Sequence, residues 1–314
     1  MPMVDPNPSF DDLLSTTLKN YRTTLVDNIF KSTVLLNHLN ERGRVVVETG
    51  GYSIVEPILW DENNTASVYA EWAQIPLTQQ DGISAAEYAW KQLAASIAIS
   101  GPEEAKNRGK EAVIKLLNAR IMQAEMSLKK VLNDQLFTGD GTGSNFFGLG
   151  EVVGTAGNTV GGIDAGTYTW WDPFIDSSTT TLGLEEMAAV YNSAANGADV
   201  PDIIVTDQNQ FQKYEGLLTN QVRYQDVSKA NAGFQNLMFK QTPVVFDKAC
   251  TADQMYFLNT KYLKLTGMSG HWFETTDFQR GTVNGYDARY ALILAYGALT
   301  CSNRSRQGAM TALT

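Results

Sequence analysis

The stretch from Pro102 to Phe137, PEEAKNRGKEAVIKLLNARIMQAEMSLKKVLNDQLF, decides how the rest of this chain can be arranged. Its apolar residues are spaced three and four positions apart, as on one face of an α-helix. The spacing therefore predicts one long amphipathic helix over the whole stretch. The residues of this apolar face are Val113, Leu116, Leu117, Ile121, Ala124, Leu128, Val131, Leu132 and Leu136.

Both ends of this predicted helix carry boundary signals. Pro102 suits a first turn because it has no N–H to leave unpaired, and the helix dipole favours Glu103 and Glu104 in the same turn. At the other end, Gly139 can adopt the left-handed conformation that closes a helix. At 1.5 Å per residue the helix would be about 50 Å long, so we expect it to span a whole domain.

Composition indicates a folded, acidic protein. The chain has 314 residues, and 43% of them are hydrophobic, which suits one elaborate domain or two subdomains and excludes a wholly disordered chain. The net charge of −10 is opposite in sign to that of most nucleic-acid-binding proteins, so any DNA contact should be local and weak. The sequence shows neither a signal peptide nor an apolar run of membrane-spanning length, and we expect a cytoplasm-like compartment.

The first 45 residues are predicted to form an N-terminal arm. Three prolines among the first eight residues favour an extended chain. A helical stripe follows between Asp11 and Leu39, made of Leu14, Leu18, Tyr21, Leu25, Ile29, Leu35, Leu36 and Leu39. Such a helix could pack on its own domain or on a neighbouring subunit, and the stripe alone leaves both open.

Between Arg44 and Ser100 the pattern changes to that of β-strands. Tyr52 to Trp60 and Tyr88 to Ile99 read as two strands, and the turn-rich stretch from Asp61 to Ala86 reads as their tip. This predicts an extended two-stranded ribbon, which has only a marginal core of its own. We expect a second subunit to cover the ribbon, although a hairpin folded back on its own domain fits the same pattern.

A glycine-rich segment, FTGDGTGSNFFGL, follows the long helix from Phe137 to Leu149. Phosphate-binding loops follow a strand and carry a Gly-Lys-Ser/Thr or a G-x-G-x-x-G motif, and this segment has none of these features. We therefore interpret it as a tight turn that redirects the chain.

The order of arm, ribbon, long helix and glycine-rich turn resembles the major capsid proteins of tailed bacteriophages, which have the Hong Kong 97-type fold. The segment from Phe137 to Leu149 is the most specific part of the resemblance. The second half is compatible with it. It reads as a helix over 183–196, a buried strand over 201–206, a helix over 207–218 and a strand over 243–246.

The resemblance implies an α+β fold in four parts. An N-terminal arm would precede an extended β-ribbon loop, a peripheral domain with a spine helix and long strands, and a compact α/β axial domain. The long strands would come from Met255–Leu265 and Ala288–Thr300, and a loop over Thr219–Gln235 would lie at the symmetry axis. The boundaries are 1–45 for the arm, 46–101 for the ribbon, 102–150 and 251–314 for the peripheral domain, and 151–250 for the axial domain.

The function implied is that of a major capsid protein, which assembles through hexamers and pentamers into an icosahedral virion shell around double-stranded DNA in the host cytoplasm. The implied partners are many further copies, a separate scaffolding protein, a portal and decoration proteins, with weak DNA contact and no membrane. Covalent cross-linking through the ribbon is not expected, because no lysine lies between Arg44 and Lys91. The candidate subunit contacts are Leu25, Phe30, Leu36, Trp60, Trp72, Trp90 and Tyr224.

Two other interpretations remain open. An encapsulin-like compartment shell would share the fold and differ in its cargo. An acidic enzyme would have its site near Trp272, Glu274 and Asp277. Against an enzyme, the chain has only two histidines, His38 and His271, which we expect in the arm helix and in a turn, and it shows no catalytic, cofactor or metal motif. The cysteines, Cys250 and Cys301, are predicted to be free thiols.

Overall fold

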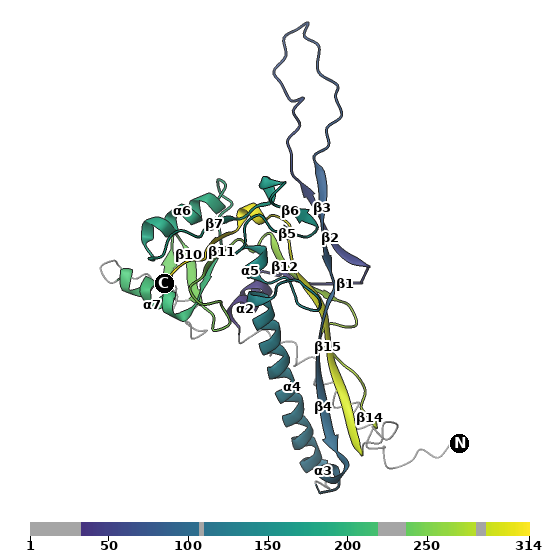
Figure 1. Cartoon of the computed structure of the whole chain (residues 1–314). Helices are drawn as coiled ribbons and strands as arrows, with labels where there is room; N and C mark the ends of the chain where they lie inside the picture. Colours follow the sequence, from purple (N-terminus) through teal and green to yellow (C-terminus); the bar gives the residue numbers. More distant parts are fainter. Residues whose placement is uncertain (1–32, 107–109, 219–236, 281–286) are drawn as a thin grey trace.

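The computed structural model describes residues 33–106, 110–218, 237–280 and 287–314. They form two mixed layers of sheet and helix, with one long helix beside the first sheet and a narrow projection that extends beyond both (Figure 1). Most of the predicted arm, residues 1–32, and the whole predicted axial loop, residues 219–235, lie outside the described residues.

The first sheet is built around strand β15 (Ala288–Cys301), which confirms the long strand predicted there. Strand β4 (Lys91–Ser100) pairs antiparallel with β15 from Lys91↔Gly297 to Ser100↔Ala288. On the other edge of β15 lie β12, β13 and β14, and β1 pairs parallel with β12. Their bounds are Val45–Glu48 for β1, Leu263–Met268 for β12, Glu274–Thr275 for β13 and Gln279–Arg280 for β14.

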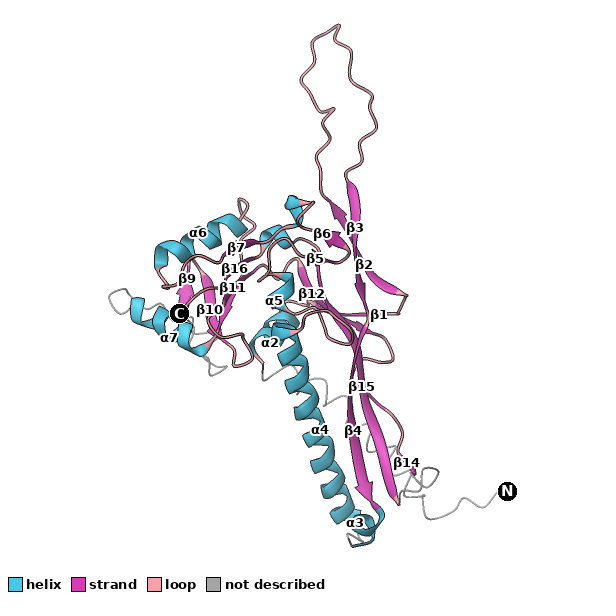
Figure 2. Ribbon diagram, in the orientation of Figure 1, coloured by secondary structure: helices cyan, strands magenta, loops and turns pink. Residues whose placement is uncertain are grey.

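The predicted long helix is present beside this sheet, as α3 (Gly101–Lys106) and α4 (Lys110–Thr138) (Figure 2). The described part of its apolar face is buried at Ile121, Ala124, Leu128, Leu132 and Leu136. Val131, predicted on the same face, is instead largely exposed. The stripe of period 3.6 thus packs against β4 and β15, as its amphipathic pattern requires.

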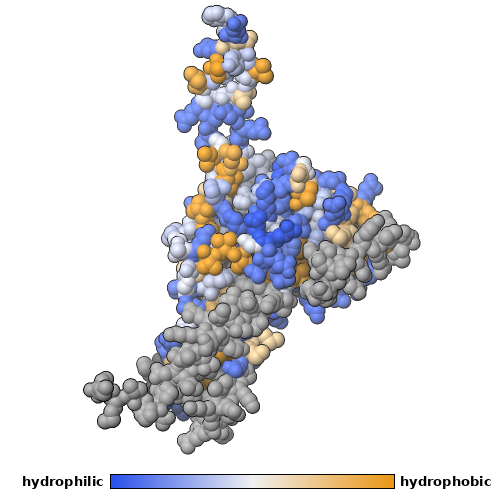
Figure 3. All heavy atoms as spheres, turned by 180° about the vertical axis from the view of Figure 1, so that it is seen from behind, coloured by the Kyte–Doolittle hydropathy of each residue, from blue (hydrophilic) through white to orange (hydrophobic). Residues whose placement is uncertain are grey.

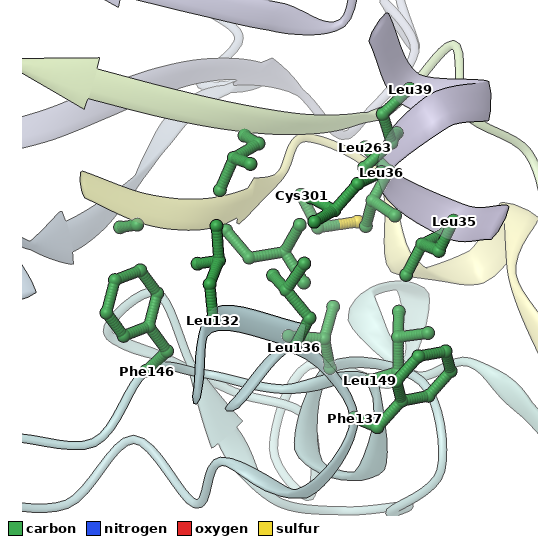
Figure 4. Close-up of a cluster of buried hydrophobic side chains, with 14 of the residues drawn as sticks. Leu35, Leu36, Leu39, Leu132, Leu136, Phe137, Phe146, Leu149, Leu263 and Cys301 are labelled. Carbon is green, nitrogen blue, oxygen red and sulfur yellow. The ribbon is translucent and has the colours of Figure 1, made fainter. Parts of the chain in front are cut away.

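Helix α2 (Val34–Glu41) corrects the predicted boundary of the arm. Its residues Leu35, Leu36 and Leu39 point toward the end of α4 and belong to the core of their own chain (Figure 4). Leu36 is 0% exposed, so it offers no surface to a neighbouring subunit and its role as a subunit contact was wrongly predicted. The helical stripe therefore packs on its own domain over this part of its length.

The second sheet has the strand order β7-β16-β11-β8-β10-β9 and carries helices α6 (Leu184–Ala194) and α7 (Gln208–Leu217). Its elements confirm the helices and strands predicted between residues 183 and 246. Asp207 caps α7 by accepting a hydrogen bond from the N–H of Gln210. The strands are β7 (Phe174–Asp176), β8 (Ile203–Thr206), β9 (Leu237–Phe239), β10 (Thr242–Phe246), β11 (Met255–Leu258) and β16 (Gly308–Met310).

The division into domains departs from the prediction after residue 250. Strand β11 and strand β16 belong to the second sheet, whereas β12 and β15 belong to the first. The predicted long strand from Met255 to Leu265 is therefore two strands, each in a different sheet. Because the chain crosses between the sheets at residues 259–262 and again after Cys301, the two layers are joined by more than one segment.

Short elements connect the two sheets beneath the projection, and the buried side chain of Arg304 holds them. Its guanidinium donates hydrogen bonds to the backbone carbonyls of Val152 and Thr155, at 2.8 and 3.0 Å, and to the Asn158 side chain. Burial lowers the pKa of this arginine. The connecting elements are α5 (Leu149–Val152), β5 (Thr159–Val160), β6 (Ile163–Asp164), η1 (Thr169–Trp171) and η3 (Arg304–Arg306).

Candidate subunit interface

The projection is a β-ribbon made of β2 (Ser53–Leu59) and β3 (Ile83–Ala89). Its second strand differs from the prediction. The ribbon turns back at Ile83, within the predicted tip, and the chain from Lys91 onward belongs to the first sheet as β4. Strand β1 likewise pairs with β12 in the first sheet. The ribbon therefore comprises residues 53–89 and is shorter than the predicted span of 46–101.

Side chains alternate along the two strands, so the ribbon has one face toward the body and one face away from it. Ile54, Ile58, Ala86 and Tyr88 are buried on the inner face. They continue the core of the first sheet and α4. The inner face explains why the base of the ribbon is fixed, although a free two-stranded ribbon has little stability.

Polar groups also hold the inner face. The carboxylate of Glu56 is buried and lies 3.0 Å from the ammonium of Lys264 on β12, and it accepts a hydrogen bond from the Thr300 hydroxyl at 3.1 Å. The Tyr88 hydroxyl donates to the carbonyl of Cys301 at 2.8 Å, and burial raises the pKa of this phenol well above its usual value. The ribbon is thereby attached to the two central strands of the first sheet.

Aromatic stacking also holds the inner face of the ribbon, at the end of β2 that leads into the loop. Trp60 stacks on Trp170 of η1, with ring centroids 5.6 Å apart. One residue of the β5–β6 turn, Gly161, approaches so closely that a Cβ would lie 2.7 Å from Ala86. The carbonyl of Gly161 also accepts the N–H of Glu87 at 2.9 Å.

The base of the ribbon is fixed by the residues where it leaves the first sheet. The indole N–H of Trp90 donates to the carbonyl of Gly51 at 3.0 Å, which joins the two ends of the ribbon. The next residue, Lys91, is buried and donates to the carbonyls of Gly141 and Gly143 at 3.0 and 2.7 Å. The segment Phe137–Leu149 is thus the predicted tight turn, and it receives the lysine that follows the ribbon.

Asp140 organises this turn in the way expected of an Asx turn. Its carboxylate accepts hydrogen bonds from the Asn145 amide and from the hydroxyl and backbone N–H of Thr142. These bonds lower the pKa of Asp140 to about 2. The carboxylate oxygens are thus committed to their own turn, which agrees with the structural interpretation of this glycine-rich segment.

The outer face of the ribbon is largely apolar and uncovered, and Glu87, opposite Val55, is its one charged residue. Val55, Leu59 and Ile83 are exposed, and the register places Leu59 opposite Ile83 and Pro57 opposite Ala85. Like the inner face, this face has the composition of a half-buried strand pair, yet it meets solvent in the isolated chain. Contiguous exposed apolar surface of this kind is typical of protein–protein contact.

The loop beyond the two strands continues this surface over residues 60–82. Figure 3 shows apolar side chains spread along the whole projection, between polar ones. Trp72 is 95% exposed. The loop has no basic residue, and its acidic residues, with that of β3, are Asp61, Glu62, Glu71, Asp81 and Glu87. The exposed apolar residues of this part are Val68, Tyr69, Trp72, Ile75 and Leu77.

The structure places the remaining predicted contacts as follows. Trp60 is 38% exposed and shared between the ribbon and η1, Trp90 is partly buried at the base, and Trp72 is free on the loop. Leu25, Phe30 and Tyr224 lie outside the described residues. The sequence analysis did not predict the outer face of β2 and β3. The sequence signal for it is that Val55, Pro57 and Leu59 are apolar at alternate positions, between residues that the structure shows to be buried.

The residues named for a possible enzyme site, Trp272, Glu274 and Asp277, lie in or beside the first sheet. Trp272 lies over Gly267 and Gly297, which are paired across β12 and β15, so close that an added Cβ on either would clash with the indole. Glu274 lies on β13, and Asp277 lies between β13 and β14. Within the described residues no cluster of His, Cys, Asp and Glu side chains could hold a metal ion.

The histidines and cysteines fit this interpretation. His38, expected in the arm helix, lies on α2 and is buried there, with its Nε2 atom 3.5 Å from the Asp202 carboxylate. His271 stacks on Tyr296. Cys250 and Cys301 are buried free thiols, as predicted, and burial raises the pKa of both, to about 12 for Cys301. Such thiols are poor nucleophiles.

Comparison with solved structures identifies the architecture. The chain superimposes on the cyanophage A-1(L) capsid asymmetric unit with a TM-score of 0.65 and 19% identity, over 86% of this chain and 90% of that one. The chain has the Hong Kong 97-type capsid fold. This capsid fold is shared with the satellite phage P4 procapsid, solved with its size determination (Sid) protein (TM-score 0.53, 12% identity, 99% and 93% coverage).

The capsid fold is also that of the virus-like particle from Pyrococcus furiosus (TM-score 0.52, 14% identity, 93% and 98% coverage). No protein-family model and no curated protein matches the sequence. None of the helices in the described part of the chain combines the length and the apolar character needed to cross a bilayer.

Proposed function

We propose that this chain is the major capsid protein of a tailed bacteriophage and that its copies assemble through hexamers and pentamers into an icosahedral shell around double-stranded DNA. The observation that carries the proposal, beyond the fold, is a ribbon whose inner face is fixed to its own body while its outer face remains apolar and uncovered. Such a ribbon suits a subunit that lies over its neighbour.

Burial of the outer face would drive the contact between subunits. Apolar burial contributes about 25 cal/mol per Å², before the cost of ordering the loop is subtracted. The attached inner face matters here, because a ribbon that is already placed loses less freedom when a neighbour covers it. Repetition of this contact around a closed shell then multiplies modest affinities.

The acidic charge agrees with the proposed role. The ribbon carries acidic and apolar residues without a basic one, and the whole chain has a net charge of −10. DNA enclosed in a shell of the same charge sign is not attracted to the wall and can move along it. We expect DNA contact to be weak, and we expect separate proteins to scaffold, open and decorate the shell.

The test is assembly of a chain with a shortened ribbon. The register that places Leu59 opposite Ile83 continues to Trp60, whose N–H bonds the carbonyl of Gly82 at 2.9 Å, so an Asn-Gly turn can replace residues 61–81 without shifting the strands. A matched variant keeps the full loop and changes Val68, Tyr69, Trp72, Ile75 and Leu77 to serine. Negative-stain microscopy and light scattering detect the shells, with a scaffold co-expressed if the chain requires one. We expect the native chain to form shells and both variants to fail.

Normal shells from the shortened chain would contradict the proposal. Shells from the serine variant together with failure of the shortened chain would show that the ribbon acts through its backbone and length. Thermal unfolding of both variants must match that of the native chain, since the replaced loop contributes nothing to either core.

A second candidate is an encapsulin-like compartment shell, which the likeness to the Pyrococcus furiosus particle supports. The two candidates share the subunit contacts and differ in contents. Particles purified from the native source would contain packaged DNA in the first case and a protein cargo in the second.

A further inference from the structure

A groove of about 580 Å³ lies between α4 and the turn that follows β10. Its apolar lining comes from Val34, Met126 and Phe246, and Met126 is 70% exposed. Methionine is flexible and adapts to the shape of an apolar partner. A groove of this volume is large enough to bury a big side chain, so it offers a docking surface.

Three lysines line the groove together with two acidic residues. Lys130 and Lys248 are exposed, whereas Lys129 is half-buried, and burial lowers the pKa of its ammonium group. None of the three lysines forms an ion pair within the described part of the chain. They outnumber the acids of the groove, Asp134 and Asp247, although the whole chain is acidic. An anionic group would therefore be stabilised in this groove.

Hydrogen-bond acceptors without donors also lie on its wall. Asn133 and Asp247 are each only 7% exposed. The Asn133 amide nitrogen donates to Asp247 Oδ1 at 3.0 Å, but Asn133 Oδ1, Asp247 Oδ2 and the Thr33 hydroxyl are buried without a partner among the described residues. Buried acceptors of this kind favour an occupant that brings an N–H group. A DNA phosphate brings acceptors only, so the groove suits a protein segment better.

The ribbon loop contains one turn that supplies everything this groove lacks. The N–H of Ala73 bonds the carbonyl of Ala70 at 2.9 Å, which places Glu71 and Trp72 at the two central positions of a turn. Trp72 is 95% exposed and offers an apolar ring with an indole N–H that can only donate. Glu71 adds a carboxylate, and the loop has no basic residue to pair with it.

We propose that the turn at Glu71 and Trp72 of one copy docks into this groove of a second copy. The Trp72 ring would cover Met126 and Phe246 while its indole N–H donates to an unpartnered acceptor. The Glu71 carboxylate would pair with the lysines. The loop extends away from the body, so it does not reach the groove of its own chain (Figure 1). This docking rests on the proposed function, because it assigns the surface that a neighbour's ribbon covers.

Carbodiimide cross-linking tests this docking, because it joins a carboxylate directly to an amine where the two are in contact. Full-length chains grown in light and in heavy nitrogen are mixed before assembly, allowed to associate as in the shell assay, cross-linked and digested. By mass spectrometry we expect the peptide of Glu71 to be linked to that of Lys129, Lys130 or Lys248. Links that join a light chain to a heavy chain would show that the two residues belong to different copies.

A pair of variants tests the role of the tryptophan. Trp72→Ser should reduce these links at least about tenfold, because a buried tryptophan is a typical anchor of a protein interface. The matched control is Leu77→Ser, which changes an equally exposed apolar residue of the same loop outside the turn and should leave the links intact. Equal yields of links in the two variants would overturn the assignment of this turn as the anchor.

The outcomes separate the docking from the proposed function. Links from Glu71 to other lysines would overturn the docking alone, and so would groove lysines linked to a carboxylate of residues 1–32. Absence of any link to the groove lysines in assembled shells would overturn it too, whether or not DNA fills the shells. Links to the groove in small oligomers that never close would support the docking and contradict the capsid function. A chain that stays monomeric with a scaffold present would contradict both.

Discussion

At the scale of single residues, Glu125 is an acid on the buried face of α4. Its side chain is 7% exposed and its Oε1 atom has no hydrogen-bond partner in the described structure. Burial raises the pKa of this carboxyl group to about 7. A group that is harder to ionise in the folded chain than in the unfolded chain makes stability depend on pH.

The sign of this dependence follows from the raised pKa. The folded state holds the proton more tightly, so the contribution of Glu125 is fully present below its usual pKa and is lost as pH rises toward about 7. We expect Glu125→Gln to remove this loss, with a gain on the order of 1 to 2 kcal/mol over the native chain at pH 8 and little gain at pH 4.5. Urea unfolding at both values measures it.

The matched control for this substitution is Glu185→Gln, at an exposed position in the first turn of α6. It should change the free energy of unfolding by less than about 1 kcal/mol at either pH, because an exposed carboxylate in a first helical turn contributes little. A Glu125→Gln variant whose stability followed the native chain across this range would show that the carboxyl group is already paired or solvated.

At the scale of elements, the ribbon depends on a buried ion pair. Lys264→Met leaves the Glu56 carboxylate buried beside Thr300 without its cation. We expect a loss of about 2 to 4 kcal/mol in the free energy of unfolding, because removing one partner strands the other charge. Urea unfolding measures the loss, and hydrogen exchange should show it first in β2 and β3.

The chain supplies a matched control three residues earlier. Lys261 pairs with Asp199 at 3.5 Å, but its side chain is mostly exposed, so Lys261→Met should cost less than about 1 kcal/mol. Equal effects of the two substitutions would contradict a ribbon anchored by a desolvated pair. The double variant Glu56→Leu/Lys264→Met should recover part of the loss, since no buried charge then remains.

Elements with a strong period were predictable from the sequence, and elements chosen by their partners were not. The spacing from Ile121 to Leu136 specified α4, and the apolar run from Ala288 to Cys301 specified β15. In contrast, β3 and β4 follow one another with only Trp90 between them and no glycine or proline to mark the boundary. Their separation becomes evident only when β2 and β15 are seen as their partners.

The candidate interface was predictable to the same extent. The exposure of Trp72 followed from a polar, turn-rich tip. The burial of Leu36 did not follow, because an amphipathic stripe fits its own core and a neighbour equally well. The three-residue strand β16 was too short to carry a pattern of its own. The outer face of the ribbon required the strand register that pairs Leu59 with Ile83.

At the scale of the whole molecule, charge opposes association between copies. Each chain carries a net charge of −10, and salt screens such repulsion over about 10 Å at 0.1 M ionic strength. We expect the protein concentration needed for assembly to fall severalfold between about 0.05 M and 0.5 M NaCl. Salt weakens the repulsion between chains, whereas apolar burial at the ribbon does not depend on screening. Light scattering against protein concentration measures it.

Sucrose at matched osmotic strength is the control, because it does not screen charge. A threshold concentration that rises with salt would indicate that ion pairs between subunits outweigh the apolar contacts of the ribbon.

Strand β15 also has a mechanical consequence. It pairs with β4 along ten residues, holds three further strands on its other edge, and continues through η3 into β16 of the second sheet. Tension along the axis of β15 would therefore load all of its inter-strand hydrogen bonds in shear at once. A pull across the strands would break these hydrogen bonds one after another. A force that pulls the two ends of β15 apart would therefore act along the direction in which this part of the chain resists most strongly.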